Sequence, residues 1–150
     1  MAAGEADFNL ERFLQAQDEA GSYERALGEL ARGKKRSHWI WFVFPQLAGL
    51  GQSPAARHFA ISSLAEAKAY LAHEELSHRL EAACRALLGL ERADAASVLG
   101  ALDAMKVASS MTLFMRADPS RAVFSEVLDR YYGGRPDPLT DELLSGRSPA

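Results

Sequence analysis

The amino-acid sequence predicts an all-α protein, a compact single-domain bundle of about eight or nine short-to-medium helices with no significant sheet. Capping residues recur along the chain just before apolar stripes with helical spacing. Only one segment, residues 37–46, has the character of a strand. The 150 residues have the hydrophobic fraction of a globular protein, 48%. We therefore expect one domain over residues 1–150, with an ordered core at about 7–144 and frayed ends.

The N-terminal part of the chain predicts two helices. Asn9 can cap the first, whose apolar stripe begins with Leu10 and Phe13. Ser22 can cap the second, which runs towards Gly33 and ends there because glycine readily adopts a left-handed conformation. Basic residues directly after Gly33 suit the negative end of this helix.

Residues 37–46 are the least ordinary segment. Every position from Trp39 to Phe44 is apolar, and propensity alone favours a strand. A lone strand cannot satisfy its own backbone, however, and the chain offers it no partner. Ser37 can cap a helix and Pro45 ends one. The segment is therefore predicted to form a short helix that is buried on all sides.

Start and stop signals mark the remaining helices. Ser53-Pro54 opens one helix, and the capping box from Ser63 to Glu66 opens the next. An apolar stripe from Leu76 to Leu88 predicts a long amphipathic helix. The later start signals are Asp94, Asp103, Asp118-Pro119 and Asp137-Pro138, with a stop at Gly133-Gly134.

Charge, cysteine content and hydropathy exclude several classes of protein. A net charge of −3 does not fit a globally basic nucleic-acid binder, so we expect no nucleic-acid partner. Cys84 is the only cysteine, which excludes an intramolecular disulfide and a multi-cysteine zinc site. No apolar run approaches the roughly 18–20 residues of a membrane span, and no signal peptide is recognisable. These features indicate a soluble, cytoplasmic protein with no membrane association.

Known motifs for metals and cofactors are not met. His73 and His78 are five residues apart, whereas two zinc ligands on one helix face need a spacing of four. The glycine-containing segment Gly49–Pro54 precedes a helix, where it can cradle an anion or form a tight turn. It lacks the strand and the lysine of nucleotide-binding loops. We therefore expect no metal and no cofactor.

Two segments combine polar groups with apolar surroundings, and these carry the candidate site. They are Lys34–Gln46 and Leu102–Phe114. On a helix, Asp103, Lys106 and Ser110 would share one face. A lysine in such a helix needs a partner, which can be Asp103 or a bound anion, unless it extends to solvent. Buried serines and threonines can instead bond to carbonyls of the preceding turn.

The leading hypothesis is a pocket for a small polar or anionic molecule, formed where these two segments meet. The candidate ligand-binding residues are Lys34, His38, Trp39, Trp41, Gln46, Ser53, Lys106, Ser109, Ser110 and Thr112. If the pocket is catalytic, His38 is the candidate base and Ser109 or Ser110 the candidate nucleophile. The alternative is a protein-interaction module without catalytic activity, in which the aromatic segment presents a groove to a partner protein.

The same two segments resemble a known family. They include Ser37–Gln46, Gly49-Leu50-Gly51, Ser53, and Lys106 with Ser109–Phe114; Glu66-Ala67, Tyr70-Leu71 and Arg79-Leu80 also match. The chain resembles the domain of unknown function 1810 family, often labelled "calpastatin", over Phe8 to Leu144. It departs from the family pattern at Glu74 and Ser77. The resemblance implies an all-helical fold and supplies no activity. True calpastatins are disordered inhibitors, and this composition is globular.

Overall fold

The computed structural model describes residues 8–91 and 94–146. Within these residues, every regular secondary-structure element is a helix. The all-α prediction is therefore confirmed. The elements are α2 (Glu11–Asp18), the 3-10 helix η1 (Glu19–Gly21), α3 (Ser22–Ala31), α4 (Ile40–Val43), α5 (Pro54–His58), α6 (Leu64–Ala72), α7 (Glu74–Leu88), α8 (Ala95–Leu99), α9 (Ala101–Ala117), α10 (Ala122–Tyr132) and α11 (Pro138–Leu144). The N-terminal tail predicted to fray, Met1–Glu5, lies outside the described residues.

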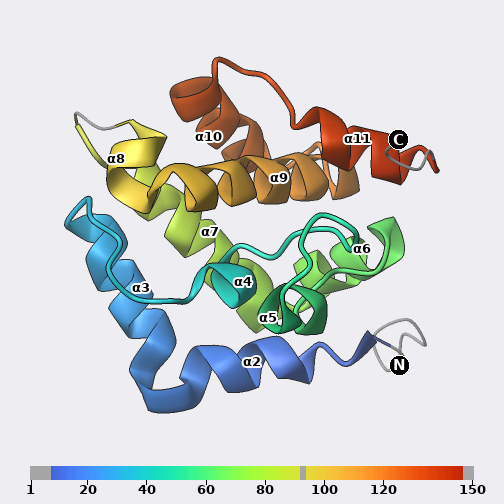
Figure 1. Ribbon diagram of the computed structural model, residues 1–150, viewed down its shortest axis with the longest axis horizontal. Helices are drawn as coiled ribbons and strands as arrows, with labels where there is room; N and C mark the ends of the chain where they lie inside the picture. The colour runs from blue at the N-terminus through green and yellow to red at the C-terminus, as the bar shows by residue number, and fades with distance from the viewer. Residues whose placement is uncertain (1–7, 92–93, 147–150) are drawn as a thin grey trace.

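The longest helix, α9, lies at the centre of the packing (Figure 1). It packs against α6, α8, α10 and α11 and also touches α4. Helix α7 runs obliquely behind it and packs against α3, α6 and α10. Helix α2 lies at one edge of the molecule, where it contacts α3 and α4. The short helix α4 lies between α2 and α9 and contacts α2, α7 and α9.

One continuous hydrophobic core joins these helices. Its largest fully buried side chains include Trp39, Tyr70 and Phe114. The Phe114 ring of α9 lies 5.2 Å from the Tyr70 ring of α6 and 5.7 Å from the Phe124 ring of α10, centroid to centroid. Such offset aromatic pairs add to the free energy of burial. Helix α9 is buried along most of its C-terminal half because neighbours cover it on several sides.

The aromatic segment forms a helix, as predicted, but only over the single turn of α4. It is buried except at Trp41, which is half-buried. After Pro45 the chain is extended and pairs locally with the segment after α5. The Ala48 amide donates to the Ile61 carbonyl at 2.8 Å, and the Ile61 amide donates to the Gln46 carbonyl at 2.8 Å. This isolated bridge fixes the backbone at Gln46 beside α4.

Four predicted helix caps are confirmed. The side chains of Ser53, Ser63, Asp94 and Asp137 each accept a hydrogen bond from the backbone amide three residues later. These caps depend only on local sequence, which is why pattern analysis finds them. The carboxylate of Glu66, the second member of the predicted capping box, accepts from the Ser62 amide rather than from that of Ser63.

Other predicted caps are wrong. Asn9 adopts a left-handed turn with φ of 52°, and α2 begins two residues later. Ser22 is inside α3, and its hydroxyl donates to the Glu19 carbonyl. Ser37 donates to a glutamate of α3 instead of capping α4. Asp103 lies inside α9, which begins after Gly100, and binds two lysines. Asp118 caps only a turn, and α10 begins at Ala122. Except at Asn9, the side chain has a different partner available.

Candidate functional site

A cleft of about 220 Å³ lies where α9 meets the loop after α4 and the start of α11. Its lining residues are Gln46, Leu50, Gly51, Leu102, Met105, Lys106, Ser109, Asp137 and Leu139. We call it the Lys106 cleft. It brings together Gln46, Lys106 and Ser109, three of the residues singled out from the sequence, although they come from two distant segments.

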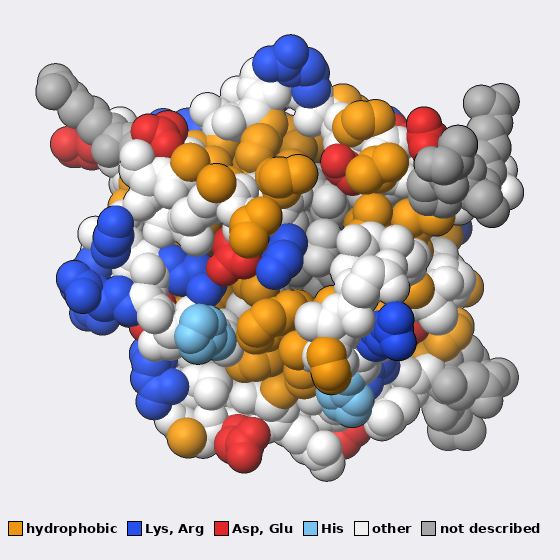
Figure 2. All heavy atoms as spheres, viewed as in Figure 1, with side chains coloured by type: hydrophobic (Ala, Val, Ile, Leu, Met, Phe, Trp, Pro, Cys, Tyr) orange, Lys and Arg blue, Asp and Glu red, His pale blue; other side chains and the backbone are white. Residues whose placement is uncertain are grey.

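The rim of the Lys106 cleft is hydrophobic and unusually exposed. Leu102, Met105 and Leu139 have 75%, 66% and 47% of their surface exposed. They are the exposed large hydrophobic side chains of the described residues, and all three line this one cleft. Figure 2 shows hydrophobic side chains gathered over α9 and α11 on this face. Clustered exposed apolar groups of this kind mark ligand-binding or protein-binding surfaces.

A chain of charges runs beside the cleft. The Asp103 carboxylate contacts Lys35 Nζ at 2.9 Å through Oδ2 and Lys106 Nζ at 3.3 Å through Oδ1. Each lysine also lies over an indole ring, with Lys35 Nζ 5.0 Å from Trp39 and Lys106 Nζ 5.3 Å from Trp41. Two cations share one anion, so the group carries a net positive charge. The Lys106 side chain is 29% exposed, which leaves its ammonium accessible from the cleft.

The loop that carries Trp39 is held by a buried glutamate that sequence analysis did not single out. Glu29 of α3 is 3% exposed. Its carboxylate accepts from the amides of Arg36 and Ser37 at 2.7 and 2.9 Å, from Ser37 Oγ at 2.6 Å and from Trp39 Nε1 at 2.9 Å. Burial alone would raise the pKa of Glu29, but these hydrogen bonds outweigh it and lower the pKa to about 2. Glu29 therefore fixes the loop beside Lys35 as a buried carboxylate.

Two of the predicted polar residues of α9 hold α11 in place. Ser109 Oγ contacts Asp137 Oδ2 at 3.2 Å, and Thr112 Oγ1 accepts from the Asp137 amide at 2.8 Å. Asp137 Oδ2 also accepts from the amide and hydroxyl of Thr140 at 3.0 and 2.7 Å. Ser110 is fully buried, and its hydroxyl has no hydrogen-bond partner within the described residues. Thr112 and Ser110 therefore lie behind the cleft rather than in it.

Replacing Asp137 by alanine is expected to lower the free energy of unfolding by about 1–2 kcal/mol, because it removes the cap of α11 and its contact with Ser109. Chemical denaturation measures the loss, and amide hydrogen exchange should show faster exchange in α11 than in α9. The matched control is Asp129→Ala, an exposed aspartate of α10 with no side-chain hydrogen bond within the described residues. A loss no larger than that of the control would contradict the assignment.

The remaining predicted site residues are dispersed. Lys34, His38 and Ser53 are exposed, and Ser53 serves as the cap of α5. No hydrogen bond within the described residues joins His38 to Ser109 or Ser110. Trp39 is 1% exposed and belongs to the core. Within the apolar run Trp39–Phe44, Trp41 alone is not buried, and the exposed large hydrophobic groups of the described residues are aliphatic side chains of α9 and α11.

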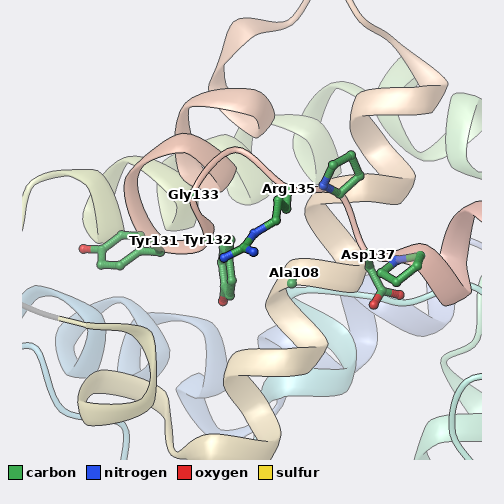
Figure 3. Close-up of a pocket in the computed structure, with 8 residues that line it drawn as sticks. Ala108, Tyr131, Tyr132, Gly133, Arg135 and Asp137 are labelled. Atoms are coloured by element: carbon green, nitrogen blue, oxygen red, sulfur yellow. The ribbon is translucent and has the colours of Figure 1, made fainter.

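A second, more open concavity of about 710 Å³ adjoins the first, with Asp137 lining both. Its lining residues are Ala108, Tyr131, Tyr132, Gly133, Arg135, Pro136, Asp137 and Pro138. We call it the Arg135 concavity. The two tyrosine hydroxyls are already bonded, Tyr131 to the Leu87 carbonyl and Tyr132 to the Ala104 carbonyl. Figure 3 shows the Arg135 guanidinium extended towards Tyr132 and the Asp137 carboxylate directed away from it.

Comparison with known proteins places the chain in a family. The model of a family described as "Protein of unknown function (DUF1810)" matches residues 7–144. The chain belongs to this family. Among solved structures, this DUF1810 protein is similar to the conserved hypothetical protein Rv1873 from Mycobacterium tuberculosis, with 45% sequence identity and a TM-score of 0.89. The match covers 92% of this chain and 97% of the other. No curated protein matches the sequence.

Family membership confirms the resemblance seen in the sequence, and it carries no assigned activity. Cys84 and His73, two residues considered in the sequence analysis, have structural roles in this DUF1810 protein. Cys84 is fully buried, its thiol contacts the Met111 sulfur at 3.6 Å, and burial raises its pKa. His73 caps α7 by accepting from the Leu76 amide at 3.2 Å. Within the described residues, no cluster of three or more potential ligands could hold a metal ion, and no helix could cross a membrane.

Proposed function

We propose that this DUF1810 protein binds a ligand that carries an anionic group and an apolar part, and that the Lys106 cleft is the site. One observation supports this most strongly. The three exposed large hydrophobic side chains of the described residues line the same cleft as an accessible ammonium group. A binding site typically combines apolar walls with a few oriented polar groups.

Lys106 and Gln46 can bind an anion, while the Asp137 carboxylate that also lines the cleft accepts hydrogen bonds from Ser109 and Thr140. Lys106 has three N–H donors, and its contact with Asp103 occupies one side of the ammonium. The Gln46 side chain also lines the cleft and makes no hydrogen bond within the described residues. A carboxylate or phosphate group between Lys106 and Gln46 would accept charge-assisted hydrogen bonds. Because the cleft measures about 220 Å³, it would hold this head group while the apolar part covers the rim.

Isothermal titration calorimetry with octanoate and hexyl phosphate tests the proposal. We expect both amphiphiles to bind wild type, and Lys106→Ala to raise Kd about tenfold through loss of one charge-assisted contact. Met105→Ser should also weaken binding because it removes an apolar wall. Lys68→Ala, which alters an exposed lysine of α6, is the matched control and should leave Kd unchanged. Absence of binding at millimolar ligand, or equal affinity of wild type and Lys106→Ala, would refute the proposal.

A further inference from the structure

The Lys106 cleft and the Arg135 concavity adjoin at the start of α11. Asp137 lines both. Its Oδ2 atom accepts three hydrogen bonds from Ser109 and Thr140. These donors within the protein stabilise the negative charge of the carboxylate. Each concavity then contributes one cation, Lys106 on one side of Asp137 and Arg135 on the other.

Arg135 is exposed and has no polar partner within the described residues. It makes no side-chain hydrogen bond or ion pair within the described residues, although five N–H groups are available on a guanidinium. Its guanidinium rests against Gly133, with atoms 3.6–4.0 Å from the position that a Cβ of residue 133 would occupy. Gly133 has a φ of +66°, a conformation that glycine adopts without strain. Arg135 therefore offers an exposed planar donor group that suits a carboxylate, and glycine at 133 leaves room for it.

The dimensions of the surface favour an extended occupant. A head group in the Lys106 cleft does not engage Arg135, which lines the adjoining concavity and not the cleft. A short apolar tail on that head group would cover part of the rim, in which Leu102 and Met105 are 75% and 66% exposed, and an extended occupant would cover more of it. An apolar surface flanked by cations is suited to a chain in which hydrophobic and acidic groups alternate at short intervals.

Positively charged side chains near this face also favour an acidic partner. The segment after α3 adds the exposed residues Arg32, Lys34 and Arg36. Figure 2 shows Lys and Arg side chains gathered at that edge of the face, on the left of the view. The chain as a whole has a net charge of −3, so this cluster runs against the overall balance. Local positive charge attracts an acidic partner and increases the rate of association.

We infer that the two concavities together bind an acidic, amphipathic segment of a partner protein. Its hydrophobic side chains cover Leu102, Met105 and Leu139, one carboxylate pairs with Lys106 and a second with Arg135. This inference rests on the proposed function, because it names the class of ligand that the Lys106 cleft would take. It adds a requirement that the proposed function lacks, namely that Arg135 takes part.

The test uses fluorescence anisotropy with a labelled synthetic peptide of about 15 residues, with leucines at helical spacing and glutamates between them. We expect saturable binding that weakens with salt, and weaker binding of a matched peptide in which glutamine replaces glutamate. Lys106→Ala and Arg135→Ala should each raise Kd about fivefold or more. Lys68→Ala and Arg85→Ala are the matched controls, since both remove exposed cations of other helices, α6 and α7.

The outcomes separate the two proposals. If Arg135→Ala binds the peptide like wild type while Lys106→Ala still weakens octanoate binding, the extended segment is overturned and the proposed function stands. If neither variant changes the binding of either probe, both are overturned. If light scattering shows that wild type self-associates and that Met105→Ser makes it monomeric, the occupant is a second copy and the inference is wrong. Tighter binding of a single-stranded oligonucleotide than of the acidic peptide would also overturn it.

Discussion

Replacing Glu29 by alanine is expected to lower the free energy of unfolding by about 3–5 kcal/mol. The substitution leaves three N–H donors, the amides of Arg36 and Ser37 and the indole of Trp39, without their acceptor. The Trp39 ring is 1% exposed, so water cannot replace the carboxylate without disturbing the core. Denaturation in urea, followed by far-UV circular dichroism, measures the loss.

The matched control is Glu24→Ala, which removes an exposed glutamate from the same helix and should cost less than about 0.5 kcal/mol. A Glu29→Ala protein as stable as this control would contradict the account of the buried carboxylate.

Because the loop held by Glu29 also carries Lys35, the same variant should change the environment of Asp103. Nuclear magnetic resonance of the Asp103 and Lys106 signals would report that change.

Glu29 also predicts a pH dependence of stability. Its pKa in the folded protein is about 2, below the ordinary value of 4.5. The folded state therefore binds the proton less readily than the unfolded state, and the stabilisation is present above pH 4.5 and lost as the pH falls towards 2. The contribution amounts to about 3 kcal/mol. Glu29→Gln should lack it, so the difference in stability between wild type and variant should shrink over this range. Parallel curves would contradict the assignment.

Replacing Arg12 by alanine is expected to have a comparable effect, a loss of about 3–4 kcal/mol. The guanidinium donates to the carbonyls of His58 and Ala60 at 2.9 and 2.8 Å and contacts the Glu66 carboxylate at 2.9 Å. Glu66 is 2% exposed, so the substitution leaves a buried carboxylate without its cation. Arg12 thereby connects α2, the segment after α5 and α6. Thermal unfolding should show a fall of several degrees.

Arg25→Ala is the control for Arg12, because Arg25 is exposed and its one side-chain hydrogen bond among the described residues goes to the Ala20 carbonyl. A double variant with Glu66→Ala tests the pairing directly. If the two groups interact, the loss in Arg12→Ala/Glu66→Ala should be smaller than the sum of the single losses. Additive losses would show that Arg12 acts through its carbonyl contacts alone.

Sequence analysis predicted the fold because its signals are local. Ser53, Asp94 and Asp137 cap helices by accepting from amides three residues away, and the further contact of Asp137 with Ser109 leaves its cap intact. Ser37 and Asp103 carry the same kind of signal, but Glu29 and Lys35 bind them instead. Those partners lie far along the chain, or on another helix, and the sequence pattern does not reveal them. Tertiary contacts therefore changed the role of these residues without changing the fold class.

The candidate site was predicted in part for the same reason. Lys106 and Gln46 share a cleft, as expected from two apolar segments with embedded polar groups. Asp137 and Arg135 were not singled out as site residues, because they follow α10 in a turn that looks like an ordinary helix connection. The sequence does contain a signal that Glu29 is buried. It follows Ala26 by three residues on the apolar face of α3, where a carboxylate needs buried donors.

The burial of α4 between α2, α7 and α9 also bears on how the chain avoids self-association while it folds. Residues 39–44 are uncharged, β-prone and entirely apolar, so an unfolded chain exposes a stretch of the kind that stacks into intermolecular β-sheets. The chain places Lys34, Lys35 and Arg36 before this stretch and Pro45 directly after it. Charge and proline at such flanks are gatekeepers against aggregation. We therefore expect Lys34, Lys35 and Arg36 to limit aggregation of the unfolded chain, a role separate from their place beside the Lys106 cleft in the folded protein.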